Sequence, residues 1–192
     1  MTAARRLLRA VAIVLIVAGH AVADAAGPHT YPATGSIELA FTPGDAIDNL
    51  VIGVIKGAQH EILVYAYTFT HRRIAQALVD AKRRGVTVAV LADREQARLV
   101  PQNVLPQLVA GGVDVWLDGN FSAAHNKVIV VDADSERAIT VTGSFNFTFA
   151  AQRSNAENVV VLRDNGPVAR AYRDNWRRLK AAAIPWSEGA LQ

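Results

Sequence analysis

The chain of 192 residues contains no cysteine. Disulfide bonds, thiolate nucleophiles and cysteine-ligated zinc are therefore excluded. Aromatic residues make up only 7% of the chain and charged residues 19%, whereas hydrophobic residues make up 51%. The sequence shows neither an internal repeat nor a low-complexity segment. This composition is typical of one globular domain, which must be stabilised by its core without any disulfide.

Excess positive charge is small and lies at the N-terminus. The formal net charge is +3, and Arg5, Arg6 and Arg9 account for all of it. Without residues 1–23, 17 basic residues face 17 acidic ones. The overall charge therefore gives no evidence of nucleic-acid binding, and any anion site must come from local clustering.

The N-terminal segment has the three-part pattern of a secretory signal peptide. Basic residues are followed by an apolar stretch from Ala10 to Gly19, and the small residues around Ala23 fit an A-x-A cleavage site. That stretch is about half of the roughly 20 residues that a membrane-spanning helix needs. We predict a signal peptide over residues 1–23 and a periplasmic or secreted protein, with a retained membrane anchor as the alternative.

Hydrophobic periodicity predicts a linker over residues 24–35, an α/β domain over residues 36–183 and a C-terminal tail over residues 184–192. Strands are expected at 36–42, 61–69, 86–93, 113–118, 128–132, 138–142 and 156–162, and helices at 45–58, 71–85, around Pro101 and Pro106, and at 168–183. Because strands and helices alternate in the first half, we expect a mixed, mostly parallel β-sheet flanked by helices on both faces. The short polar segment "DADSER" predicts an antiparallel hairpin.

Polar side chains gather at the ends of that hairpin. His125 and Lys127 precede the apolar run "VIVVD", while Ser144 and Asn146 follow Gly143 at the end of "AITVTG". Residues i and i+2 share one face of a strand, so each pair projects to one side and the hairpin brings the pairs together. An ammonium and two neutral donors suit an oxyanion, and phosphate best. The imidazole adds the ability to attack phosphorus or to carry a proton.

These residues resemble the HKD signature of the phospholipase D superfamily. The segment "HNKVIVVD" has the form H-x-K-x(4)-D, "GSFN" has the form G-S-x-N, and Glu157 fits the acidic residue that follows in the family. The resemblance covers roughly residues 36–180 and is strongest to the Nuc-like bacterial endonucleases, which are exported and carry one such motif per chain. One departure is the longer segment between Asp132 and Gly143, which leaves Asp134 as an alternative for the motif aspartate.

The resemblance implies a phospholipase D-like fold and a metal-independent, two-step hydrolysis of phosphodiesters without a cofactor or metal site. The implied roles are nucleophile for His125, orientation of the imidazole for Glu157, phosphate binding for Lys127, Ser144 and Asn146, and support of the motif for Asp132 and Gly143. The reaction needs a second HKD histidine, which this chain lacks. The resemblance therefore implies a homodimer with a shared active site.

Several other features admit more than one interpretation. His29, His60 and His71 lack the x-K partner, and we expect structural roles for them in the linker, at a helix end and near a helix N-cap. The segment 67–69 either lines the cleft or belongs to the core. The basic C-terminal segment 163–180 is either a solvated helix face or a phosphate contact.

Three functions remain open at the level of sequence. The first is an exported, non-specific endonuclease acting on DNA or RNA, and the second is a phospholipase D-type lipid phosphodiesterase. The absence of a long apolar or amphipathic insertion favours nucleic acid over phospholipid. The third is a non-catalytic binding module, which the complete set of His125, Lys127, Ser144, Asn146 and Glu157 disfavours.

Overall fold

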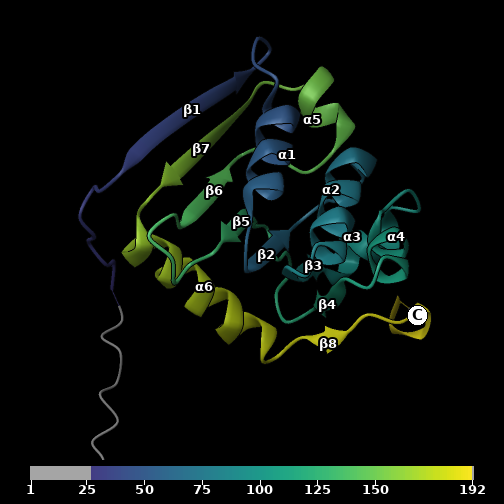
Figure 1. The fold of residues 1–192 in the computed structure, drawn as a ribbon. Helices are drawn as coiled ribbons and strands as arrows, with labels where there is room; N and C mark the ends of the chain where they lie inside the picture. Colours follow the sequence, from purple (N-terminus) through teal and green to yellow (C-terminus); the bar gives the residue numbers. More distant parts are fainter. Residues whose placement is uncertain (1–26, 192) are drawn as a thin grey trace, which may run out of the picture. The chain divides into compact units, whose positions relative to one another are not determined.

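The computed structural model describes residues 27–191, of which residues 31–191 belong to one compact unit (Figure 1). The predicted signal peptide, residues 1–23, lies outside the described residues. Within the described part of the chain, no helix combines the length and the apolar character needed to cross a membrane.

Strands and helices follow one another along the compact unit. The strands are β1 (Ser36–Thr42), β2 (Glu61–Ala66), β3 (Thr87–Asp93), β4 (Asp114–Asp118), β5 (Lys127–Val131), β6 (Ile139–Gly143), β7 (Glu157–Arg163) and β8 (Ile184–Pro185). The helices are α1 (Ile47–Gly57), α2 (Arg72–Arg83), α3 (Arg94–Leu99), α4 (Leu105–Ala110), α5 (Phe149–Arg153) and α6 (Gly166–Lys180), with a 3-10 helix at Glu188–Leu191.

All strands of the described chain join one mixed sheet in the order β1-β7-β6-β5-β2-β3-β4-β8. The α/β class and the mixed sheet are confirmed, but the expectation of mostly parallel strands is wrong. Only the pairs β2–β3 and β3–β4 are parallel, and the other five neighbouring pairs are antiparallel. A parallel pair needs a crossover of a dozen or more residues, and β5 is reached from β4 without a helix.

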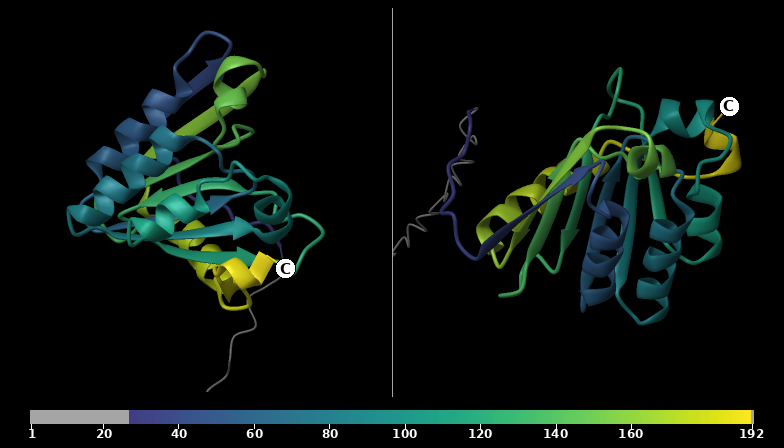
Figure 2. Two further views of the ribbon diagram at one scale, coloured as in Figure 1. Left: turned by 90° about the vertical axis from the view of Figure 1, so that its right-hand side faces the viewer. Right: turned by 90° about the horizontal axis from the view of Figure 1, so that it is seen from above.

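Helices cover both faces of the sheet, as predicted (Figure 2). Helices α1, α2 and α4 pack on one face, where Ile62 and Val64 of β2 join their core. Helix α6 packs on the other face, against Leu63 and Tyr65 of the same strand. Because β2 is buried on both faces, its sequence reads as a nearly continuous apolar run.

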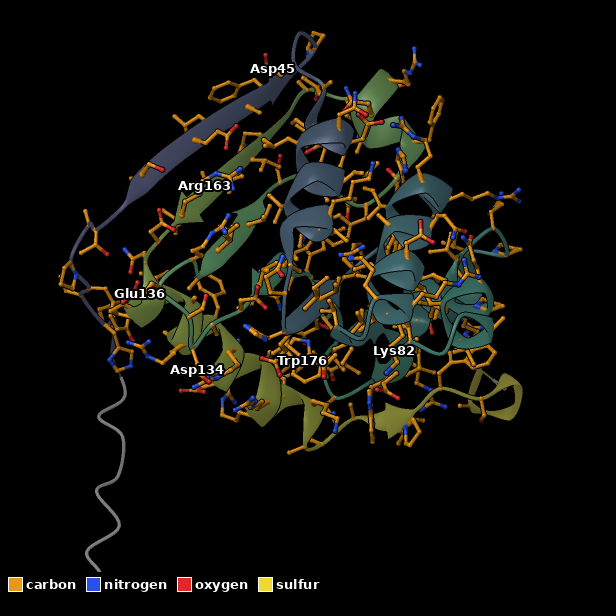
Figure 3. The ribbon with its side chains drawn as sticks, in the orientation of Figure 1. Asp45, Lys82, Asp134, Glu136, Arg163 and Trp176 are labelled. Atoms are coloured by element: carbon orange, nitrogen blue, oxygen red, sulfur yellow. The ribbon has the colours of Figure 1, made fainter. Side chains whose placement is uncertain are left out.

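Helix α6 is fixed to the sheet through its side chains (Figure 3). Trp176 lies in the core and donates from Nε1 to the carbonyl of Val64 at 2.9 Å. Arg173 forms an ion pair with Asp134 at the hairpin tip at 2.5 Å, and Arg177 pairs with Glu61 of β2 at 3.4 Å. These arginines therefore have partners within the chain, which supports a structural part for the basic C-terminal segment.

Some element boundaries differ from the sequence prediction. Helix α1 begins at Ile47 rather than after Asp45, because the carboxylate of Asp45 accepts a hydrogen bond from the backbone of Phe41 instead of capping the helix. Strand β2 ends at Ala66, before the predicted end at residue 69. Residues 184–185, predicted as part of a tail, form β8, in which Ile184 pairs with Leu117 of β4.

Candidate active site

The residues predicted for catalysis and phosphate binding lie at one edge of the sheet. The parallel strands β2, β3 and β4 end at this edge, and the antiparallel strand β5 begins there, with Lys127 paired to Ala66. The register between β5 and β6 pairs Val128 with Thr142, which sets Lys127 beside the end of β6. The hairpin thus brings the two polar pairs to the same edge, as the sequence predicts.

His125 and Lys127 form a direct contact. Lys127 is only 7% exposed, and its Nζ lies 2.9 Å from Nδ1 of His125 and donates to the His125 carbonyl at 3.0 Å. An ammonium group can only donate, so Nδ1 is the acceptor and a neutral His125 ring carries its proton on Nε2. The imidazole itself belongs to an exposed residue, which leaves it accessible to a substrate.

Tyr67 completes this arrangement. Its ring centroid lies 4.3 Å from that of His125, and Nζ of Lys127 lies 4.9 Å from the same ring. Tyr67 therefore lines the site, whereas Phe69 is buried in the core and Thr68 donates to Gln96 of α3 at 2.8 Å. The segment 67–69 thus contributes both to the lining of the site, through Tyr67, and to the core, through Phe69.

Burial changes the acidity of Lys127. Loss of hydration disfavours the charged ammonium and lowers the pKa of Lys127 below the usual lysine value, while the nearby carboxylate of Glu157 partly opposes that effect. Glu157 therefore acts electrostatically on the cationic half of the site. The ammonium is held where desolvation strengthens its attraction to an incoming anion.

Ser144 and Glu157 form a second hydrogen-bonded group. The hydroxyl of Ser144 donates to Oε2 of Glu157 and accepts from the backbone N–H of Asn158 at 3.0 Å. The other carboxylate oxygen of Glu157 accepts from Asn155 at 2.9 Å. In the described chain, the contact at Nδ1 of His125 is therefore made by Lys127, and the bonded partners of the Glu157 carboxylate are Ser144 and Asn155. This differs from the orienting role that the resemblance implied for Glu157.

Asn146 is poised for an external partner. Its side-chain Oδ1 is buried and has no hydrogen-bond partner within the described part of the chain. The amide can present either its oxygen or its NH₂ group by a half-turn about its last torsion. A buried polar group without a partner is costly, so binding of a phosphate group here would also relieve that cost.

Asp132 and Gly143 support the hairpin rather than the chemistry. Asp132 lies beyond the far end of β5, where its carboxylate accepts from the backbone N–H groups of Gln59, His60 and Glu61 at 2.7–2.8 Å. At Gly143, with φ of +154°, a Cβ atom would lie 2.3 Å from the carbonyl oxygen of Asn158 on β7. Only glycine allows this close approach, which keeps Ser144 beside β7.

Two other histidines lie in the compact unit that the structure describes, and neither belongs to the group formed by His125 and Lys127. His71 is the N-cap residue of α2 and is buried. Its Nε2 lies 3.4 Å from the carboxylate of Asp48, and burial is the main reason that its pKa is lowered. His60 lies in the connection from α1 to β2, near Asp132.

Two buried aspartates that sequence reasoning missed hold the loop before His125. Asp93, at the end of β3, accepts from the N–H of Ala124 and from the N–H of Gln96, both at 2.7 Å. Asp118, at the end of β4, accepts from the hydroxyl of Tyr65 at 2.5 Å, and burial together with this bond raises the pKa of Tyr65. The signal in the sequence was an acid directly after each of the apolar runs "VLA" and "VWL".

Across the described residues, no three His, Asp or Glu side chains are grouped in a way that could hold a metal ion. The cationic group that the site does contain is the ammonium of Lys127. The arrangement therefore offers a nucleophile, a fixed positive charge, a hydroxyl and an amide to a substrate that carries a phosphate.

A family model and several known proteins are similar to the chain in sequence. The family model described as "Cardiolipin synthase, PLD-like domain" matches residues 51–180. A protein of Rickettsia felis named phospholipase D is 36% identical over 146 residues, which are 76% of this chain and 70% of that protein. The mitochondrial cardiolipin hydrolase of Xenopus laevis is 31% identical over 134 residues, which are 70% of this chain and 60% of that protein.

Solved structures lead to the same family. Nuc from Salmonella typhimurium, described as a phospholipase D family member, superimposes with a TM-score of 0.73 at 32% identity, covering 80% of this chain and 99% of Nuc. NucT from Helicobacter pylori has the same fold, with a TM-score of 0.70 at 23% identity over 79% of this chain and 99% of NucT. With the family model matching most of the described chain, this protein belongs to the phospholipase D superfamily and is a phosphodiesterase of that family.

Proposed function

We propose that the chain is an exported, metal-independent endonuclease that hydrolyses the phosphodiester bonds of nucleic acids through a phosphohistidine. The observation that carries this proposal is the exposed imidazole of His125, whose Nδ1 lies 2.9 Å from the buried ammonium of Lys127. Export to the periplasm or the medium rests on the N-terminal sequence pattern alone.

In the first step, His125 attacks phosphorus and a P–N bond forms while the bond to the leaving oxygen breaks. A second histidine gives its proton to that oxygen. In the second step, this histidine takes a proton from water, the resulting hydroxide attacks phosphorus, and the P–N bond breaks to release the product and restore His125. Lys127, Ser144 and Asn146 bind the phosphate oxygens in both steps.

The ring proton must move for this reaction. In the resting chain Lys127 lies at Nδ1, so the proton of a neutral ring is on Nε2. Attack by Nε2 requires the proton on Nδ1 instead. A bound phosphate offers new acceptors to the ammonium of Lys127, which frees Nδ1 to become protonated and to donate to a carboxylate such as Glu157.

The second histidine comes from a second copy of the chain. Only His125 has the H-x-K context, so two copies would place their sites together about a two-fold axis. Support comes from β1, a strand at the edge of the sheet whose Ile37, Leu39 and Phe41 are exposed on one face. Thr42 at its end pairs with Glu157, so this apolar stripe runs up to the site and offers a surface to the second copy.

Exposed arginines favour a polyanionic substrate. They lie on segments that begin at or near the active-site edge, and they are Arg72 of α2, Arg94 of α3 and Arg153 of α5. Arg73 and Arg98 are exposed there as well, but they are paired with the carboxylates of Asp48 and Glu95. Phosphate groups along a nucleic acid strand would find positive charge on several sides of His125. This local cationic character stands in contrast to the balanced charge of the chain without its first 23 residues.

A phospholipid is the second candidate substrate. Two relatives carry names that point to lipids, phospholipase D and mitochondrial cardiolipin hydrolase. Helix α5, which follows the G-S-x-N segment, also exposes the ring of Phe149. Both substrates are phosphodiesters, so the chemistry of His125 would be the same.

A parallel incubation tests the proposal. Full-length protein is mixed separately with plasmid, single-stranded DNA, RNA and vesicles of labelled cardiolipin and phosphatidylcholine, each with and without EDTA. We expect cleavage of nucleic acid that survives EDTA, and loss of that cleavage in His125→Ala with an unchanged circular dichroism spectrum. Cleavage of lipid alone would replace the proposal with the phospholipase function. Loss of activity in EDTA that magnesium restores would contradict the metal-independent mechanism.

A further inference from the structure

A second hollow lies at the same edge of the sheet as His125. It has a volume of about 380 Å³ and is formed at the carboxyl ends of β3 and β4 by the start of α3 and the loop after β4. Its walls include Arg94, Glu95, Arg98, Gly119, Phe121 and Ser122. This volume lies within the range of about 300–1,000 Å³ that is usual for small-ligand pockets. None of the catalytic roles assigned above uses it.

One carboxylate joins this pocket to the active site. Asp93 caps α3 through the N–H of Gln96 and accepts from the N–H of Ala124, the residue directly before His125. The helix that forms one wall and the backbone of the nucleophile are therefore held by the same buried side chain, which is 2% exposed.

The pocket presents an aromatic ring and a fixed guanidinium group. Phe121 is 53% exposed, although it lies on a loop that is otherwise tied down by Asp93 and Asp118. Arg94 donates from Nε to the carbonyl of Ala190 at 3.2 Å. Its side chain lies against Gly119, where a Cβ atom would come within 3.0 Å of Cδ of Arg94.

The charges of the pocket favour a neutral ligand over a phosphate group. Glu95 accepts two hydrogen bonds from Arg98, at 2.6 and 3.0 Å, and the carboxylates of Asp93 and Asp118 are buried and bonded. The lining thus carries three carboxylates and two guanidinium groups, so the cavity has no excess of positive charge for a phosphate. The pocket therefore offers a ligand both hydrogen-bond donors and acceptors, next to the exposed ring of Phe121.

We propose that this pocket binds one unpaired nucleobase of the substrate strand, stacked on Phe121, with the polar groups of α3 and of Ser122 facing the edge of the base. The proposal rests on the proposed nuclease function and adds a substrate class to it. In a duplex the base edge is paired and both faces are stacked, so only a single-stranded or flipped base can enter. The pocket therefore makes the chain prefer single-stranded nucleic acid near the scissile bond.

Equilibrium binding to a protein that cannot cleave tests this pocket. Full-length His125→Ala is titrated with fluorescent single-stranded DNA and with the matching duplex, and compared with double variants that also carry Phe121→Ala, Phe121→Leu or Phe121→Tyr. We expect Phe121→Ala and Phe121→Leu to weaken single-strand binding about tenfold and duplex binding by less than about twofold, while Phe121→Tyr retains the affinity. Val109→Ala removes an exposed apolar side chain from α4, outside the pocket, and should change neither affinity.

The outcomes separate this inference from the proposed function. An equal loss on single strand and duplex, or full retention of single-strand affinity by Phe121→Leu, would overturn the base-stacking pocket while leaving nuclease activity in place. The same variants are also titrated with cardiolipin vesicles. If Phe121→Leu keeps vesicle binding that Phe121→Ala loses, the pocket takes a lipid chain and the inference is wrong. If the wild-type chain cleaves no nucleic acid at all, the proposed function fails, and this inference fails with it. Melting temperatures of all variants show whether each is folded.

Discussion

Lys127 meets two opposing demands. Its side chain is buried at the start of β5, where loss of hydration disfavours the charged ammonium. The proposed hydrolysis, however, requires the ammonium to be charged. Its pKa is lowered by burial and raised in part by Glu157. The residue that we propose to stabilise a bound phosphate is therefore one whose charge lowers the stability of the folded chain.

This balance predicts the alkaline limit of activity. The reaction needs the charged ammonium, so the rate should fall at a pH below the usual lysine pKa of about 10.4. Glu157→Gln removes the carboxylate that raises the pKa of Lys127, so the alkaline limb of the pH–rate profile should move to lower pH. Glu61→Gln, at the opposite end of β2, is the control and should leave the limb in place. A limb that does not move, or moves upward, in Glu157→Gln would show that Lys127 does not set it.

The same burial predicts a gain in stability when the charge is removed. Because the pKa of Lys127 is lower in the folded chain, the unfolded state binds the proton more tightly, and stability should rise with pH between the folded and unfolded pKa values. Lys127→Met keeps most of the volume without the charge. We expect a higher melting temperature at neutral pH together with a loss of activity on the order of 10²-fold or more. A lower melting temperature in calorimetry would show that the bonds of Lys127 to His125 outweigh its desolvation.

At the scale of elements, the β5–β6 hairpin carries chemistry at one end and support at the other. Lys127 begins β5 at the active-site edge, and Asp132 follows the opposite end of the strand, where it binds three backbone N–H groups. The H-x-K-x(4)-D segment thus runs along the full length of β5. Its aspartate acts on the connection between α1 and β2, not on a substrate.

Asp132→Ala should separate stability from chemistry. Three backbone donors lose their acceptor, so we expect a loss of about 1–3 kcal/mol in the free energy of unfolding, measured by urea denaturation. The activity per folded molecule should stay within about twofold, since the site is at the other end of β5. Asp134→Ala is the matched control, because its ion pair with Arg173 is exposed on the Asp134 side and should be worth less than about 1 kcal/mol. If Asp134→Ala were the more damaging change, Asp134 would be the motif residue.

Gly143 offers a comparison between two glycines. Gly143→Ala would place a methyl group 2.3 Å from the carbonyl oxygen of Asn158, so β7 must shift and Ser144 with it. We expect a loss of roughly 1–3 kcal/mol and reduced activity. Gly53→Ala, in α1, meets nothing within 4 Å and should stabilise the helix by about 0.5–1 kcal/mol. Equal melting temperatures for the two variants would mean that β6 and β7 do not require the close approach.

Most elements could be predicted from the sequence, and the exceptions share a physical cause. Long apolar runs such as β2 and β3 and the amphipathic helix α2 have strong periodic signals, so they were found. Helix α5 has five residues and β8 has two, which is too short for a periodic signal. Both owe their existence to tertiary contacts, such as the pairing of β8 with β4.

For the whole molecule, the sequence indicated the position of the site better than the order of the sheet. The H-x-K and G-S-x-N segments were correctly expected at one end of a hairpin, because strand periodicity and a short turn decide that locally. The antiparallel pairing of β5 with β2 joins segments that are far apart in the sequence. A local sequence pattern therefore could not predict this pairing. Asp93 and Asp118 each follow an apolar run, which the sequence shows, but the partners Ala124 and Tyr65 lie on other elements and could not be predicted.

The reaction also imposes a requirement on the assembly. The proposed mechanism needs one histidine that starts neutral and attacks, and another that starts protonated and donates. The reaction therefore needs one imidazole in each protonation state, so the rate should fall on both sides of an optimum pH. The chain contains one histidine in the H-x-K context, so the account requires two copies to share one site.

A mixed dimer tests this central claim most directly. Wild-type and His125→Ala chains carrying different tags are co-expressed, and the hybrid with one copy of each is isolated by two affinity steps and confirmed by light scattering. The shared site predicts that the hybrid has almost no activity, because each reaction needs both copies of His125. A hybrid that keeps half of the wild-type activity would show that each chain works alone and would contradict the account.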